Sequence, residues 1–485
     1  MSILHTSLFA SPLPSVLGAG FHNVGSVLRA SNSATLKYVE QHYGERCGHL
    51  PLDARRIRVL VNSPTADIQE QMDYLSRLFG KAIIPLTFDE FKQEKEQAEV
   101  LAPLVVPYIN VPETEALLRD ELGAEAWGLP GKMTHVLKNK VSFYQLADEF
   151  GMEGFYPPDY TVSSVYDVAE VAAHFLSDVE ELYKETGVAQ SYPLGVMLRA
   201  AESDGNYGCC LVYESPEGVV VVPNGDADHA QVYAQWQEAL ALSQAHLAAT
   251  MNAEKESRVV ISRYIDFADS PGMSVVMMHG KVESLGWNGQ LQKKGSKACI
   301  GTSTYLPKTP YVARMQEQYE AQTAVFFEAL LRKTAQKCGV DFPSIRGVAN
   351  LDIMIPGKME ARLQRKRKQP VANYLAECNP RWTNYTDAIM TVLGANREEP
   401  TIAHMRAVIQ AGICTFDKHP LPENVDPRIV RAWIAERDEV LQGEGTRIIC
   451  RMATNPMGLI FAGDVKRAQQ EMHALLMMLS AREIL

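Results

Sequence analysis

Two strand-like segments on either side of residue 365 constrain the fold most. Residues 348–355 (VANLDIMI) and 374–378 (YLAEC) are mainly apolar, yet the first contains Asp352 and the second Glu377. Asn379 follows two residues after Glu377, and side chains with this spacing project from the same face of a strand. An antiparallel pairing of the two segments would bring Asp352 beside Glu377. We therefore expect a sheet on which two carboxylates and an amide converge.

The donor atoms of this cluster suit a divalent cation. Carboxylate and amide oxygens are hard ligands, which fit Mg²⁺ bound jointly with substrate phosphates. Pro380 then ends the strand, and Arg381 offers a planar cation that matches phosphate or carboxylate. We predict metal ligation by Asp352, Glu377 and Asn379 and a catalytic role for Arg381. The alternative is a solvated sheet face without a ligand.

Length and composition limit the class of protein. A chain of 485 residues exceeds one compact core, so two to four domains are expected. The net charge of −11 argues against binding of a nucleic-acid backbone, and no apolar run reaches the length of a membrane span. The N-terminus lacks a basic residue before its apolar stretch, and the eight cysteines form no CxxC pair. We expect a cytoplasmic protein with reduced thiols, with no nucleic-acid or membrane partner.

The first part of the chain alternates strand and helix patterns. Residues 57–62 and 82–86 are typical of buried strands, and the helical spacing at 68–78 lies between them. A further strand is predicted within 103–112. This alternation predicts an α/β domain with a largely parallel sheet. The stretch 18–25 (GAGFHNVG) lacks the spacing of a dinucleotide fingerprint, so we expect a loop or turn there.

From residue 136 the pattern changes to an α+β arrangement. Helices are predicted at 143–150, 163–187, 228–252, 402–412, 427–440 and from 464 onward. Strands are predicted at 195–199, 209–213, 258–265, 274–279, 447–452 and 459–461. The connection 358–368 contains six basic residues, which we expect to be solvated. The alternative is that it guides an acidic substrate or a carrier partner.

Asp352 on one strand, followed by Glu377-x-Asn379-Pro380-Arg381 on the next, resembles the metal-site signature of the ATP-grasp superfamily, carboxylate-amine ligase type. The resemblance covers roughly residues 100 to 395. It implies an α/β and α+β fold in four parts. These are an N-terminal α/β pre-ATP-grasp domain (1–135), a first lid (136–262), a second lid with the metal site (263–395) and a C-terminal extension packed on the second lid (396–485).

The resemblance also implies which residues hold ATP. Lys140, in KNKVSF, matches the lysine that opens the ATP-binding unit. Arg199 occupies the strand position of a phosphate-contacting lysine and is expected to serve both ATP binding and catalysis. The loop 202–208 (ESDGNYG) is similar to the glycine loop that closes on the triphosphate; an ordinary hairpin turn is the alternative. The nucleotide contacts predicted from this loop are Ser203, Gly205 and Gly208.

The segment 260–265 (VISRYI) resembles the hinge between the two lids, where backbone groups would read adenine. Ser262 stands where the family usually has an acidic residue. The ribose partner is Asp266 or Asp269, and the sequence does not decide between them. The hinge contacts predicted for the nucleotide are Ser262, Arg263, Tyr264, Ile265 and Asp266.

The activity implied by the resemblance is ATP-dependent joining of a carboxylate to an amine. Mg²⁺, for which Mn²⁺ could substitute, would bridge the phosphates, and the carboxylate would become an acyl phosphate before the amine displaces phosphate. The expected partners are small, amino acid-like acids and amines, with a biosynthetic amide or peptide product, and a homodimer is the default assembly. One alternative is a bicarbonate-activating enzyme similar to carbamoyl phosphate synthetase or a carboxylase. Another is a nucleotide-binding regulatory protein without turnover.

Overall fold

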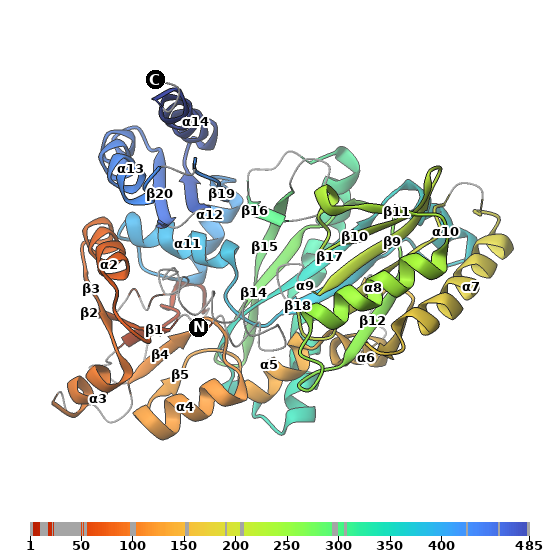
Figure 1. Cartoon of the computed structure of the whole chain (residues 1–485). Helices are drawn as coiled ribbons and strands as arrows, with labels where there is room; N and C mark the ends of the chain where they lie inside the picture. The colour runs from red at the N-terminus through yellow and green to blue at the C-terminus, as the bar shows by residue number, and fades with distance from the viewer. Residues whose placement is uncertain are drawn as a thin grey trace.

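The computed structural model describes residues 3–9, 18–21, 23, 50, 52, 56–97, 103–150, 155–189, 192–203, 208–292, 299–304, 308–422, 425–453 and 456–482. Within these residues the strands form sheets of five, six and ten strands. Figure 1 shows the five-stranded sheet close to the C-terminal helices and the six-stranded sheet at the opposite end of the molecule, with much of the ten-stranded sheet between them.

The five-stranded sheet is parallel, in the order β3-β2-β1-β4-β5. Its strands are β1 (Gly18–Phe21), β2 (Arg56–Leu60), β3 (Ala82–Leu86), β4 (Leu104–Pro107) and β5 (Glu125–Ala126), with helices α2 (Ala66–Phe79), α3 (Phe88–Gln97) and α4 (Pro112–Leu122). Helix α2 begins after Thr65, whose hydroxyl accepts a hydrogen bond from the Ile68 N–H, and ends at Gly80, where φ is 65°. The predicted α/β class with a parallel sheet is confirmed.

The six-stranded sheet is antiparallel, in the order β11-β10-β9-β8-β12-β7. Its strands are β7 (Tyr160–Ser164), β8 (Gly195–Ala200), β9 (Cys209–Ser215), β10 (Gly218–Pro223), β11 (Gln231–Tyr233) and β12 (Arg258–Arg263), with helices α7 (Val168–Thr186) and α8 (Trp236–Thr250) and a short 3-10 helix (Ala227–His229). Val196 and Leu198 of β8 pack with residues of α7 and α8 in one apolar cluster. Because side chains alternate along a strand, Met197 and Arg199 lie on the uncovered face.

The ten-stranded sheet runs β20-β21-β19-β16-β15-β14-β17-β18-β6, and β13 pairs with β17 off this path. Its strands are β6 (Phe155–Tyr156), β13 (Phe267–Asp269), β14 (Gly272–Met278), β15 (Lys281–Gln292), β16 (Cys299–Ser303), β17 (Gly347–Pro356), β18 (Asn373–Asn379), β19 (Cys414–His419), β20 (Arg447–Met452) and β21 (Met457–Ala462). The pairing of β16 with β19 joins the C-terminal strands to the rest of the sheet.

Helices cover this sheet and connect its strands. They are α5 (Gly131–Lys138), α6 (Lys140–Phe150), α9 (Pro310–Cys338), α10 (Lys358–Lys366), α11 (Asn384–Ala395), α12 (Ile402–Gln410), α13 (Pro427–Gln442) and α14 (Val465–Arg482), with 3-10 turns at Ile3–His5 and Phe342–Ser344. Met315 and Tyr319 of α9 belong to the same apolar cluster as Leu351 and Ile353 of β17. Helix α9 therefore covers the face of β17 opposite to Asp352.

The prediction of a loop or turn at 18–25 is wrong for its first part. Residues Gly18–Phe21 form β1, the central strand of the parallel sheet, between β2 and β4. The nearest partners of this strand in the sequence are residues of β2, where Gly18 pairs with Ile57 and Phe21 with Leu60, so no local pattern reveals the pairing. Of the remaining positions in this stretch, 22, 24 and 25 lie outside the described residues.

Two predicted helices begin later than expected because short strands precede them. The helix predicted at 163–187 begins at Val168, since Tyr160–Ser164 is strand β7 on β12. The helix predicted at 228–252 begins at Trp236, after strand β11 on β10. Both strands gain their partners from elsewhere in the sheet, and this pairing overrides the local helical spacing.

The basic connection 358–368 holds a helix, α10, that the sequence pattern did not predict. Its first turn is capped from another segment, because Asp266 Oδ2 accepts a hydrogen bond from the Met359 N–H at 2.9 Å. The expectation of solvation holds for most of its cations, and Arg367 is the exception, half-buried and paired with Asp159. The exposed basic residues are Lys358, Arg362, Arg365, Lys366 and Lys368.

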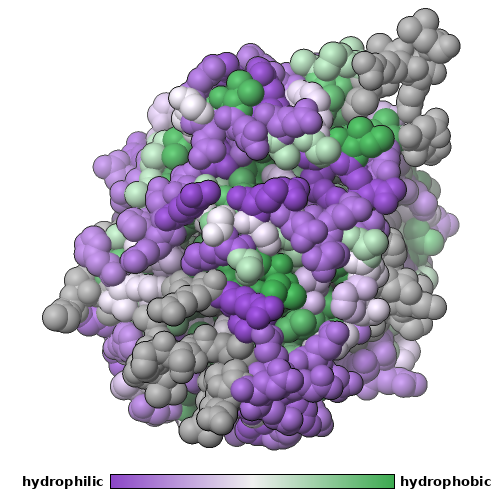
Figure 2. Space-filling model, turned by 90° about the vertical axis from the view of Figure 1, so that its left-hand side faces the viewer, coloured by the Kyte–Doolittle hydropathy of each residue, from purple (hydrophilic) through white to green (hydrophobic). Residues whose placement is uncertain are grey.

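The side of the molecule seen in Figure 2 is mainly hydrophilic, and its hydrophobic residues gather in small areas. In the described part of the chain, no helix combines the length and apolar character needed to cross a bilayer. The described cysteines are free thiols: Cys209, Cys210, Cys338, Cys378, Cys414 and Cys450. The four domain boundaries given above remain predictions.

Candidate active site

The two predicted metal-binding strands are neighbours in the ten-stranded sheet. β17 and β18 pair antiparallel, with Asp352 directly opposite Glu377 and Asn350 directly opposite Asn379. All four polar side chains are on one face of the ladder by strand alternation, and the ladder shifts register just after Asp352. The structure thus brings together the three side chains that the sequence predicted to converge.

An amide lies between the two carboxylates. Asn379 Nδ2 donates to Asp352 Oδ2 at 3.1 Å and to Glu377 Oε1 at 3.4 Å. Asn350 Nδ2 donates to Asp352 Oδ1 at 2.9 Å, and the Ser274 hydroxyl in turn donates to Asn350 Oδ1. Neutral amides therefore donate hydrogen bonds to both acidic side chains.

The two carboxyl groups differ in their proton affinity. Burial raises the pKa of Asp352 well above its usual range, and the neighbouring Glu377 carboxylate adds to this effect. Burial also acts to raise the pKa of Glu377, but the nearby cations of Lys140, Arg199 and Arg381 outweigh it and lower the value to about 2. Glu377 is thus the ionised member of the pair, and its field acts on Asp352.

Lys140 is the cation closest to this pair. It is the first residue of α6, its side chain is 4% exposed, and its Nζ lies 3.0 Å from Glu377 Oε2. The same Nζ donates to the carbonyl and hydroxyl oxygens of Ser203, at 2.9 and 3.2 Å. Its backbone N–H donates to Ala201 O at the end of β8. Lys140 therefore joins the first part of the glycine loop to the carboxylate face.

Arg381 reaches the same cluster from the end of β18. Its Nη2 donates to Asn379 Oδ1 at 2.8 Å, and its Nη1 donates to the Tyr108 hydroxyl at 2.7 Å and to Trp382 O at 2.9 Å. Tyr108 directly follows β4 of the parallel sheet. The guanidinium is thus held by residues from two sheets, with only 9% of the residue exposed.

Arg199 connects the six-stranded sheet to the ten-stranded sheet. Its Nη1 donates to Ala376 O of β18 at 2.8 Å, and its Nη2 donates to the Tyr144 hydroxyl, which itself donates to Ala376 O at 3.1 Å. Its Nε is buried and has no hydrogen-bond partner among the residues that the structure describes. Glu377 follows Ala376 in the sequence, so Arg199 lies beside the carboxylate pair.

Beside Arg199, the uncovered face of the six-stranded sheet is apolar. Met197 pairs with Leu211 in the β8–β9 ladder, and both pack with Tyr213 and Tyr264 in one small cluster. The Tyr213 and Tyr264 rings stack with centroids 6.1 Å apart. An apolar platform next to buried cations suits a ligand with a flat ring at one end and negative charge at the other.

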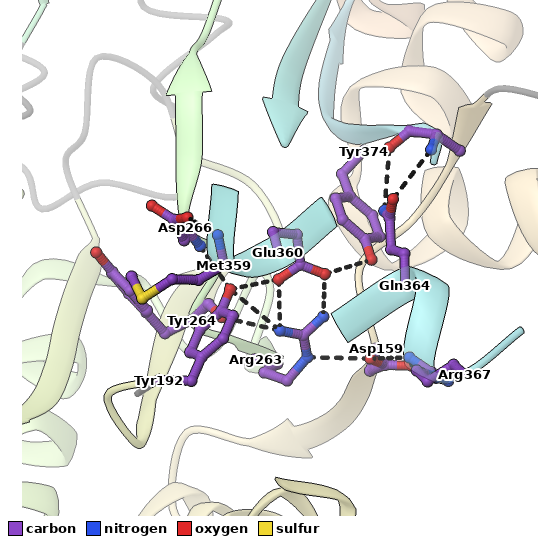
Figure 3. A network of polar contacts seen from close by, with 11 residues as sticks. Asp159, Tyr192, Arg263, Tyr264, Asp266, Met359, Glu360, Gln364, Arg367 and Tyr374 are labelled. Atoms are coloured by element: carbon purple, nitrogen blue, oxygen red, sulfur yellow. Dashed lines mark hydrogen bonds and ion pairs between the residues drawn. The ribbon is translucent and has the colours of Figure 1, made fainter. Parts of the chain in front are cut away.

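Three of the predicted hinge residues, Arg263, Tyr264 and Asp266, lie at or just after the end of β12 and appear in the network drawn in Figure 3. Arg263 is fully buried and binds both oxygens of Glu360 on α10, with 2.8 Å for each contact. Glu360 also accepts hydrogen bonds from the Tyr374 hydroxyl at 2.7 Å and from the Tyr192 hydroxyl. Asp159 accepts from Arg263 Nε at 3.1 Å. Arg263 is thus occupied by protein partners.

The remaining hinge positions are partly engaged in backbone pairing. The Tyr264 N–H donates to Gly195 O, and the Asp266 N–H donates to the Tyr192 hydroxyl. Ser262 is buried, and its hydroxyl lies 3.5 Å from Met197 O. Ile265 is buried as well. The hinge is therefore close to the apolar platform, but several of its polar groups already have partners.

The predicted glycine-loop and ribose-binding residues also have protein partners where the structure describes them. Gly208, with φ of 69°, accepts a hydrogen bond at its carbonyl from the Ala200 N–H, which closes the base of the loop. Gly205 lies outside the described residues. Asp266 caps α10, as described above, and Asp269 accepts a hydrogen bond from the Ser270 N–H, with its pKa raised mainly by burial.

Sequence reasoning missed several residues that shape the site. Tyr144, Tyr108 and Glu360 each bind one of the predicted arginines through side chains from distant segments. The sequence around a tyrosine in an amphipathic helix, or around a glutamate in a basic segment, does not indicate that the side chain binds an arginine. Met197 and Leu211 could have been found, because strand alternation places Met197 on the face of Arg199.

Comparison with known proteins gives matches at the level of structure but none at the level of sequence. No protein-family model matches the sequence, and comparison with curated proteins finds no match. Among solved structures, the chain is similar to N5-carboxyaminoimidazole synthase from Aspergillus clavatus, with a TM-score of 0.50 and 11% identity over 96% of this chain and 99% of that chain. Biotin carboxylase from Campylobacter jejuni matches with a TM-score of 0.48 and 12% identity over 94% of this chain and 89% of that chain.

At this level of identity the likeness to the Aspergillus clavatus structure concerns the fold. It extends over nearly the full length of both chains. The chain therefore shares the fold of this N5-carboxyaminoimidazole synthase.

Proposed function

We propose that the protein is an ATP-dependent ligase that activates a carboxylate as an acyl phosphate and joins it to an amine, releasing ADP and phosphate. The observation that carries the proposal is the pair of facing carboxylates, Asp352 and Glu377, with three cationic side chains around it. This cluster lies beside an apolar platform on the opposing sheet. The Aspergillus clavatus neighbour is a complex with ADP and 5-aminoimidazole ribonucleotide, which is consistent with nucleotide binding by this fold.

The donor set fits a magnesium ion. Two carboxylates and an amide are on one face of the β17–β18 ladder. Burial and, after it, the Glu377 carboxylate raise the pKa of Asp352, and a divalent cation bound there would offset both effects. Asn379 Oδ1 accepts from Arg381 in this conformation, so ligation by Asn379 requires its amide to turn toward the carboxylates. Asp352, Glu377 and the turned Asn379 would hold Mg²⁺, or Mn²⁺ in its place, and the bound cation would supply positive charge that offsets the charge of the ATP phosphates.

Lys140 and Arg199 are proposed to bind the ATP phosphates. Both are near Glu377 and at one end of the apolar platform, so an adenine ring on the platform would direct its phosphates toward them. Ser203 and Gly208, together with Gly205, would close over the phosphates, and Ser262 to Asp266 would border the adenine. A ribose contact by Asp266 would use Oδ1, since Oδ2 holds α10; Asp269 remains the alternative.

The residues then perform positioning and electrostatic stabilisation. Arg381 would hold the substrate carboxylate or the transferring phosphoryl group, as a planar donor fixed by Tyr108 and Trp382. In-line attack by the carboxylate on the γ-phosphate forms the acyl phosphate, and the amine displaces phosphate from it. Contact between the lids through Arg199 and Ala376 would help to exclude water from the acyl phosphate.

The test is a coupled assay for ADP and phosphate with pools of amino acid-like carboxylates and amines, followed by mass spectrometry of the amide product. Release of ADP that needs both an acid and an amine supports the ligase. Release with bicarbonate and no organic acid would instead identify the bicarbonate-activating alternative. Tight ATP binding with no turnover in any pool would identify the regulatory alternative. The homodimer, the cytoplasmic location and the domain boundaries given above remain part of the proposal.

A further inference from the structure

A second pocket lies outside the candidate active site, between the first half of α9 and the segment that joins α10 to β18. Its volume is about 400 Å³. Met315, Tyr319 and Val371 line its floor, and Arg314 and Arg365 stand among the polar residues of its wall. Met315 and Tyr319 pack on the side of β17 opposite to the carboxylate pair. The pocket is therefore separated from the candidate active site by the thickness of the sheet.

Two cations of this pocket lack an acidic partner. Arg314 stacks on the Tyr311 ring at 5.7 Å, and neither Arg314 nor Arg365 forms an ion pair within the described residues. Both guanidinium groups act on the Tyr311 hydroxyl, although burial dominates and raises its pKa. The amides of Gln318 and Gln322 lie in the same wall. Paired cations and neutral donors thus converge on one concave surface.

The charge around this pocket contrasts with the charge of the chain. The protein carries a net charge of −11, yet the exposed face of the neighbouring α10 adds Lys358, Arg362 and Lys366, which likewise have no acidic partner in the described part of the chain. A local positive field in an acidic protein attracts anions toward this pocket. It also keeps the pocket from being filled by the chain's own carboxylates.

The pocket is connected to both strands that carry the proposed metal ligands. The Tyr311 hydroxyl donates to Pro356 O, the last residue of β17, at 2.9 Å. The Tyr319 hydroxyl donates to Val371 O, two residues before β18, at 3.0 Å. A ligand that shifts either tyrosine would therefore act on the end of β17 or the start of β18.

We propose that this pocket is an accessory binding site for a small phosphate-bearing molecule. Guanidinium groups offer paired N–H donors that match phosphate oxygens, and two of them suit a diphosphate better than a single charge would. The tyrosine, methionine and valine side chains offer an apolar surface to the rest of such a ligand. A concave pocket of this volume favours a small molecule over the flat contact of a protein partner. Its links to β17 and β18 give bound phosphate a route to influence the active site.

The test is isothermal titration calorimetry with inorganic pyrophosphate, performed with a non-hydrolysable ATP analogue and Mg²⁺ present so that the proposed active site is occupied. The double variant Arg314→Gln/Arg365→Gln is compared with Arg362→Gln/Lys366→Gln, which removes the same charge from the same surface outside the pocket. We expect the pocket variant to bind pyrophosphate at least tenfold more weakly. The control variant should stay within about twofold of the unmodified protein. All four side chains are exposed, so both variants should keep the thermal midpoint of the parent.

Three outcomes would overturn the proposal. The first is an equal loss in both double variants, which would indicate a diffuse surface field. The second is the absence of pyrophosphate binding at millimolar concentration. The third is binding of an acidic peptide without binding of pyrophosphate, which would make the surface a protein contact. Titration of an organic diphosphate alongside pyrophosphate then shows whether the apolar floor adds affinity.

Discussion

Two buried charged clusters of this protein are built differently, although each joins segments that are distant in the sequence. In the hinge cluster, Arg263 and Glu360 bind each other through two contacts of 2.8 Å, and both side chains are fully buried. In the carboxylate cluster, Asp352 and Glu377 face each other with an amide between them, and the pKa of Asp352 is raised by burial and by its neighbour. In the hinge cluster each buried charge faces an opposite charge, whereas in the carboxylate cluster Lys140 binds Glu377 and Asp352 faces a second acidic side chain.

This difference indicates which cluster is structural and which binds a ligand. A buried ion pair with all partners present holds a conformation, and removing one member leaves an uncompensated charge. Two facing carboxylates reduce stability unless a cation joins them, so such an arrangement is typical of a functional site. Substitutions in the two clusters should therefore have opposite effects on stability and activity.

The largest expected effect is on turnover. Glu377→Ala should reduce ATP-dependent product formation by several orders of magnitude, because loss of a shared metal ligand costs on the order of 4 kcal/mol or more of transition-state stabilisation. The measurement is ADP release with the acid and amine that the coupled assay identifies, and thermal unfolding verifies the fold. Glu283→Ala is the control, a glutamate of the same sheet that pairs with Arg406. A folded Glu377→Ala protein with normal turnover would contradict the assignment of the carboxylate cluster as the ligand-binding one.

The next effect is on stability at the hinge. Glu360→Gln should lower the free energy of unfolding by about 3 kcal/mol, since the buried Arg263 charge loses its two-contact partner and keeps, of its acidic partners, only the single contact with Asp159. Urea unfolding followed by fluorescence measures the change. Glu328→Gln removes a carboxylate from an exposed pair with Arg332 and should cost less than about 1 kcal/mol. Equal, small decreases in the free energy of unfolding of both variants would mean that the buried pair of Arg263 and Glu360 stabilises the fold no more than an exposed pair does.

The smallest effect should have the opposite sign. Asp352→Asn removes one of two facing carboxylates and keeps the shape of the side chain, so the free energy of unfolding should rise by about 1 kcal/mol while turnover falls. The same urea experiment without divalent cation measures it. A clear loss of stability would show that Asp352 is a structural group like Glu360.

Sequence reasoning reached the carboxylate cluster because strand alternation and antiparallel pairing are local rules. Glu377 and Asn379 project together from β18 by their spacing alone, and one pairing assumption added Asp352. Lys140 and Arg199 came from the order of the family motifs, and the structure places them beside Glu377. These residues of the candidate site could be predicted because their arrangement depends on only a few contacts between segments that are distant in the sequence.

The hinge cluster could not be predicted from the sequence, because its contacts join segments that are distant in the chain. Helix α10 was not predicted either, because it lies in a segment rich in basic residues. Glu360 is one acid in a basic run, and only the docking of α10 against Arg263 makes it a buried partner. The same limitation explains β1, whose neighbours in the sheet are remote segments. The number of basic residues correctly predicted a solvated face of α10, but it gave no indication of the face that is buried.

The most direct test of the carboxylate cluster is a crystal grown with Mn²⁺ and a non-hydrolysable ATP analogue, measured at a wavelength where manganese scatters anomalously. We expect an anomalous peak between Asp352 and Glu377, coordinated by oxygens of both side chains and by the analogue's phosphates. A structure with the nucleotide bound and manganese held away from these two carboxylates would contradict the account.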